Sequence, residues 1–105
     1  MKQLFNWNFL QKRAPKGIKE VIEKLPEIDK LIKEAAKDRP ISEINKIDLA
    51  ILRLAIFELI IDKGTPPKVV IDEAIELGKE FGSDSSSSFI NGALGKVVDI
   101  LKIKI

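Results

Sequence analysis

The feature that most constrains this chain is an apolar stretch of fifteen residues, 47–61, with the sequence IDLAILRLAIFELII. Its three charged residues, Asp48, Arg53 and Glu58, are five positions apart, so each lies about 140° around a helix from the one before. A surface helix keeps one polar side, and this stretch has none. Its length exceeds that of a typical strand, and Leu, Ala and Glu favour helix. We therefore expect a helix enclosed by other helices, with Arg53 paired to a carboxylate or to helix C-terminal carbonyls.

Size and composition limit the class of protein. A chain of 105 residues with 45% hydrophobic and 32% charged residues is typical of one small globular domain. Without cysteine or histidine it lacks disulfides, nitrogen–sulfur zinc sites and the usual general base at neutral pH. No stretch is typical of a signal peptide or a spanning helix. We expect one cytoplasmic domain over residues 1–105, with no membrane contact.

Helical periodicity continues on both sides of the central stretch. It predicts a short aromatic helix within residues 1–11, and a long amphipathic helix over residues 17–37 that Pro26 should kink or split. After it, Ser42 offers an N-cap to a short turn. No segment alternates with a period of two over a useful length. The chain is therefore predicted to be all-α, a compact bundle of about five helices with short loops.

Glycines mark the two helices that follow the central one. Gly82 should end the first of them, and the serine-rich residues 83–88 should cap the second. Gly92 and Gly95 lie inside that last helix, where each costs about 1 kcal/mol relative to alanine. We expect the close approach of another helix to compensate this cost.

The sequence lacks the residues that most catalytic sites need. No glycine-rich phosphate loop is present, and no serine–histidine or cysteine–histidine pair can form. Asp72, Glu73 and Glu76 lie within about one helical turn, and such carboxylates can hold magnesium, but they are also typical of a solvated helix face. We expect a binding module without a metal or other cofactor, and not an enzyme.

One loop is basic. Residues 12–19 hold four positive charges, from Lys12, Arg13, Lys16 and Lys19. Such a run is commonly a solvated linker. The alternative is a set of phosphate contacts, whose strength would fall steeply with salt.

Three motifs, in order, resemble the NusB family of bacterial transcription antitermination factors. The first runs from Asp48 to Leu59, the second over residues 67–82 (PKVVIDEAIELGKEFG), and the third is FINGAL at residues 89–94, similar to that family's FVNG(V/A)L motif. Residues 4–9 and 27–32 match more loosely. The resemblance covers most of the chain, and the order and spacing of the motifs make it specific.

The resemblance implies an all-α domain that binds RNA. Members of the family pair with the small-subunit ribosomal protein NusE. Together the two proteins bind the single-stranded boxA element of nascent transcripts, chiefly ribosomal RNA leaders. Recognition of this kind combines basic contacts with base stacking.

The family's RNA surface transfers to this chain only in part. Phe5 and Phe89 match aromatic positions at its two edges, and Ser88 stands where members often carry lysine. A simpler interpretation of Phe89 is core packing. Asp48 matches a position that is usually charged, and we interpret it as a contact to a partner. The RNA-binding residues predicted from the resemblance and from the local charge are Lys2, Phe5, Lys12, Arg13, Lys16, Ser85, Ser88 and Phe89.

The start of the chain departs from the family. Residues matching its arginine-rich first segment and its second helix are not found in this sequence, so we interpret the chain as an N-terminally shortened member, natural, truncated or redesigned. A second copy would cover helices that such shortening exposes, so a homodimer is one expectation. Two alternatives remain. One is a scaffold domain of this fold that has lost RNA binding, and the other is the RNA-binding domain of an rRNA cytosine methyltransferase, which requires a large catalytic domain.

Overall fold

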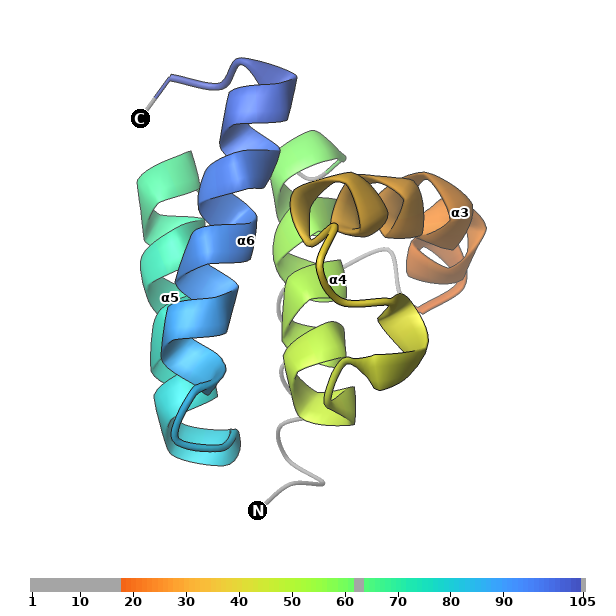
Figure 1. The fold of residues 1–105 in the computed structure, drawn as a ribbon. Coiled ribbons are helices and arrows are strands. Elements are labelled where there is room, and N and C mark those ends of the chain that lie inside the picture. The colour runs from red at the N-terminus through yellow and green to blue at the C-terminus, as the bar shows by residue number, and fades with distance from the viewer. Residues whose placement is uncertain (1–17, 62–63, 105) are drawn as a thin grey trace.

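The computed structural model describes residues 18–61 and 64–104 of the chain (Figure 1). In these residues it forms four α-helices and one turn of 3₁₀ helix, and no strand. The elements are α3 (Ile18–Ala35), η2 (Ile41–Glu43), α4 (Lys46–Ile60), α5 (Pro67–Phe81) and α6 (Ser86–Leu101). The predicted all-α class is confirmed. The helix predicted within residues 1–11 lies outside the described residues.

The helices form two layers around α4. Figure 1 shows α5 and α6 side by side and antiparallel, while α3 crosses on the other side of α4. The central helix contacts each of the other three, and α3 also reaches α6. Within the described part of the chain, no helix is both long and apolar enough to span a bilayer.

The enclosure predicted for the central stretch is confirmed. Nine residues of α4 are buried, among them Leu52, Ile56 and Phe57 at no more than 1% exposure. The helix begins after Asn45, whose side chain accepts hydrogen bonds from the backbone N–H groups of Ile47 and Asp48. Such a cap satisfies donors that the first turn leaves unpaired.

Two local expectations differ from the structure. The first concerns α3, which continues through Pro26 as one helix, so of the predicted kink or split the split does not occur. The proline ring lies on the exposed side, where water can satisfy the carbonyl that loses its N–H partner. The second concerns Ser42, which lies inside η2 and does not cap it, because the N-cap of η2 is Pro40.

The glycines divide into crowded and open positions. Gly82 ends α5 as predicted, and a Cβ there would clash with the Ser86 side chain and lie 2.8 Å from the Gly78 carbonyl oxygen. A Cβ at Gly92 or Gly95 would meet no atom of another described element within 4 Å, so among the described helices the close approach expected there is not found. The α5–α6 pair instead comes close at Gly78, where a Cβ would lie 2.8 Å from Ile90 Cδ1.

Candidate nucleic-acid interface

The loop between α5 and α6 is held by a buried serine. Ser86 is fully buried, and its hydroxyl accepts the backbone N–H of Ser83 at 2.8 Å. The Ser86 side chain occupies the space that the missing side chain of Gly82 leaves free. The exposed Ser85 is the N-cap residue of α6 but makes no side-chain cap bond. The bond from Ser83 to Ser86 closes the loop tightly and sets where the first turn of α6 begins.

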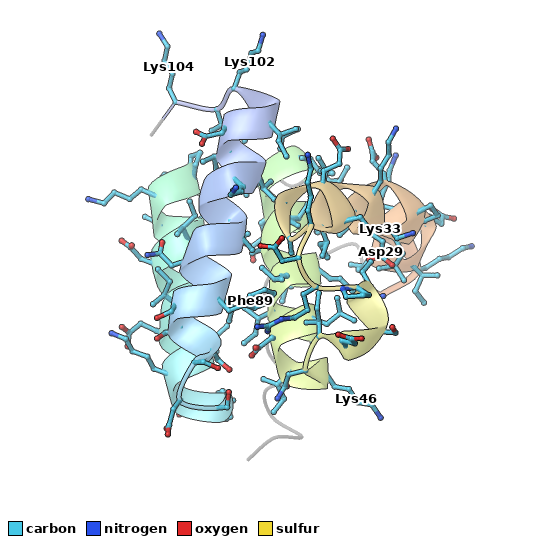
Figure 2. All side chains as sticks on the ribbon, in the orientation of Figure 1. Asp29, Lys33, Lys46, Phe89, Lys102 and Lys104 are labelled. Atoms are coloured by element: carbon cyan, nitrogen blue, oxygen red, sulfur yellow. The ribbon has the colours of Figure 1, made fainter. Side chains whose placement is uncertain are left out.

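Phe89 lies just after this turn. Its ring is half-buried against the edge of the core, so it takes part in packing and also keeps part of its surface accessible. The guanidinium carbon of Arg39 lies 4.4 Å from the ring centroid, the distance of a cation–π contact. Figure 2 shows Phe89 on the side of α6 nearer to α4. An aromatic ring with a planar cation above it is therefore present at the surface.

A groove extends from this pair along α6. We call it the α3/α6 groove; its volume is about 690 Å³. One wall is the end of α3 with the loop that follows it, residues 34–39, and the other is one face of α6. The α6 residues recur at helical spacing: Ser88, Phe89, Gly92, Ala93, Lys96, Asp99 and Ile100.

The charges around the α3/α6 groove cancel. Its cationic residues are Lys37, Arg39 and Lys96, and its anionic residues are Glu34, Asp38 and Asp99. The floor carries small or apolar residues, including Ala35, Ala36 and Ala93. Such a groove suits a ligand that is close to neutral better than it suits a run of phosphates.

The structure brings together one part of the predicted RNA site. Ser88 and Phe89 line the groove, and the exposed Ser85 lies one turn earlier. The other predicted residues fall outside the described part of the chain: Lys2, Phe5, Lys12, Arg13 and Lys16. The position of Arg39 over the Phe89 ring was not predicted from the sequence, where Arg39 belongs only to the segment that follows the long amphipathic helix.

Asp48 is not at the surface. Its side chain is 2% exposed, and no described residue donates a hydrogen bond to Oδ1. The carboxylate lies in the first turn of α4, where the partial positive charge of the helix end offsets some of its burial cost. This burial argues against the predicted contact between Asp48 and a protein partner.

The acidic turn of α5 behaves as a surface feature. Asp72 and Glu76 are exposed, and Glu76 lies 3.5 Å from the Lys79 ammonium. Among the described residues, no group of three or more acidic side chains could hold a metal ion.

Comparison with known proteins identifies the family. The NusB family profile matches residues 11–99. A protein of Chloroflexus aggregans is 55% identical over 73 residues, which cover 68% of this chain and 49% of the relative. A protein of Lachnoclostridium phytofermentans is 49% identical over 80 residues, 76% of this chain and 61% of the relative. One of Clostridium botulinum is 46% identical over 87 residues, 83% and 59% of the two chains.

All three relatives are named transcription antitermination protein NusB, a role without catalysis, in agreement with the expectation that the chain is not an enzyme. The chain spans only about half to three-fifths of their length. The match to the family profile nevertheless extends over most of this chain, and includes α3, α4 and α5 in full and α6 except for its last two residues. The chain belongs to the NusB family.

Proposed function

We propose that the chain is a transcription antitermination factor that binds boxA-type single-stranded RNA together with the ribosomal protein NusE. The structural observation that carries the proposal is the Arg39–Phe89 pair at the start of α6. Proteins that bind single strands stack bases on aromatic rings and add contacts from cations. Action on nascent transcripts would place the protein in the cytoplasm. We also propose that the chain can form a homodimer.

The surroundings of Phe89 support this function. Ser85 and Ser88 are exposed beside it, and their hydroxyl groups can donate to phosphate or ribose oxygens. The ring is anchored by the core on one side, so it can present a fixed stacking surface. A ring held in place loses little side-chain entropy when a base binds to it.

A second function is favoured by one observation. The charges of the α3/α6 groove cancel, so this face by itself provides little attraction for a polyanion. A domain that kept the fold and bound only protein partners would have such a face. In that case the chain would bind NusE or another protein without RNA.

A titration separates the two functions. A fluorescently labelled boxA-type strand is titrated with the chain at two salt concentrations, with and without purified NusE. We expect saturable binding that weakens with salt, and much weaker binding to a duplex of the same sequence, whose bases are not free to stack. If no strand binds at low salt in either condition, RNA binding is ruled out. Retained binding to NusE would then favour the second function.

A further inference from the structure

We infer that the outer side of the α4–α5 pair is the docking surface of the chain's own N-terminal segment, residues 7–16. We call this surface the α4/α5 face; its residues include Ile51, Ala55, Glu58, Val70, Glu73 and Leu77. The segment places apolar side chains on the face and cations beside its carboxylates. This docking goes beyond the proposed function, because it requires no RNA. Charge, accessible apolar surface and chain length support it.

The α4/α5 face carries two carboxylates around one small pocket. Glu58 of α4 is 4% exposed, Glu73 of α5 is half-buried, and both line a depression of about 10 Å³. Like charges in such positions repel each other, and burial makes each of them costly unless positive charge lies close by. The depression is far smaller than the cavities that hold separate ligands. A cationic side chain that reaches over its rim fits this chemistry.

The exposed side of α5 extends the negative charge. Asp72, Glu76 and Glu80 follow one another at spacings of four residues and, with Glu73, share one helix face. Val69 lies on the same side and is 42% exposed. Figure 1 shows α5 on the side of the molecule opposite to α3, so α3 does not cover this surface. The surface therefore combines negative charge with accessible apolar area.

The N-terminal segment has the opposite charge. Residues 1–17 contain no Asp or Glu, and residues 7–16 hold three cations, Lys12, Arg13 and Lys16. Trp7 and Leu10 precede them, three positions apart, so one helical turn would place both on the same side. Such a segment is complementary to a face with an apolar floor and an acidic rim. Its cations then serve to hold the segment and do not contact an RNA strand.

The chain before α3 is long enough for this docking. Seventeen residues at about 3.3 Å each can reach about 56 Å when extended. The longest dimension of the molecule is 30 Å. The segment leads into Ile18, the first residue of α3, and α3 packs directly against α4. It therefore enters beside one of the two helices that form the face.

The test uses Trp7, the only tryptophan of the chain. Its accessibility is measured by acrylamide quenching of the full chain, without RNA. Glu73→Lys reverses a charge on the α4/α5 face, and Asp99→Lys is its matched control, because Asp99 lies on α6 at the α3/α6 groove. Circular dichroism and thermal unfolding check that each variant is folded.

We expect Trp7 of the wild type to be quenched several-fold less than in the chain unfolded by urea, because a docked indole is shielded from acrylamide. Glu73→Lys should remove most of this shielding, since a like charge then faces the basic segment. Asp99→Lys should leave the shielding unchanged.

Arg13→Glu provides a second, independent variant, because it changes the segment and leaves the face as it is. It should expose Trp7 as Glu73→Lys does. Combining Arg13→Glu with Glu73→Lys should restore the shielding, since opposite charges again face each other. Two damaged folds would not restore each other in this way.

Three results would overturn the docking. Trp7 of the folded wild type could be as accessible as in the unfolded chain, which would leave the α4/α5 face to another partner. Glu73→Lys and Asp99→Lys could have equal effects, which would show that the charge of this face does not hold the segment. Shielding that is lost on dilution would place the segment on a second copy of the chain. The measurement contains no RNA, so none of these results affects the proposed function, and a failure of RNA binding would leave the docking intact.

Discussion

Arg53 on α4 and Asp29 on α3 form a two-point ion pair. The Nε group of Arg53 donates to Oδ1 of Asp29 at 3.0 Å, and Nη2 donates to Oδ2 at 2.9 Å. The two side chains are 31% and 25% exposed, so the pair lies at the edge of the core. It joins the central helix to the one that crosses it, and it confirms the expectation that Arg53 has a carboxylate partner.

We predict that this pair stabilises the fold through its geometry. Arg53→Lys should lower the free energy of unfolding by about 1 kcal/mol, since lysine cannot make the two parallel bonds and the pair is partly solvated. Chemical denaturation measures this change, and a double-mutant cycle with Asp29→Asn should give a coupling of similar size. The exposed Glu76–Lys79 pair, at 3.5 Å, is the control and should couple by less than about 0.5 kcal/mol. Equal couplings would contradict the prediction.

The serines before α6 should differ sharply in their effect on stability. Ser86→Ala removes the acceptor of the Ser83 N–H in a fully buried place, which should cost about 1–3 kcal/mol. Ser88→Ala changes an exposed side chain and should stay within about 0.5 kcal/mol. Thermal unfolding of the two variants tests this. A loss of similar size in both would show that burial does not distinguish these serines.

Substitution by alanine should lower the free energy of unfolding at a crowded glycine and raise it at an open one. Gly82→Ala forces a methyl group against Ser86 and the Gly78 carbonyl, and should destabilise by about 1–3 kcal/mol. Gly95→Ala adds a methyl group in open space inside a helix, and should stabilise by up to about 1 kcal/mol. Urea unfolding of both variants measures the difference. A stabilising Gly82→Ala would mean that the loop can move away.

Phe89 should affect RNA binding more than stability. Phe89→Leu keeps an apolar side chain against the edge of the core but removes the stacking surface, so we expect a loss of about 1–3 kcal/mol in the binding of a boxA-type strand. Because the ring is only half-buried, the loss in unfolding free energy should be smaller. Fluorescence anisotropy and thermal unfolding measure the two effects. A large loss of stability with unchanged affinity would assign Phe89 to packing alone.

Several features of this protein follow from local sequence. The stretch at residues 47–61 has no polar side, which is sufficient to predict that α4 is enclosed. Gly82 marks the end of α5, and the charge of Arg53 on an apolar helix requires a partner. These predictions succeed because helical periodicity, helix termination and the free-energy cost of burying a charge depend on neighbouring residues or on one residue alone.

Other features depend on which helix faces lie against each other. Arg39 and Phe89 are far apart in the chain, and only the packing of α3 against α6 places one over the other. Gly82 and Gly92 are both glycines near or within helices, yet one is crowded and the other borders a groove. Asp48 is buried although a charge near a helix start is commonly solvated. Periodicity determines which residues share a helix face. Only the tertiary structure decides which element packs against that face, and therefore which of its residues are buried and which border open space.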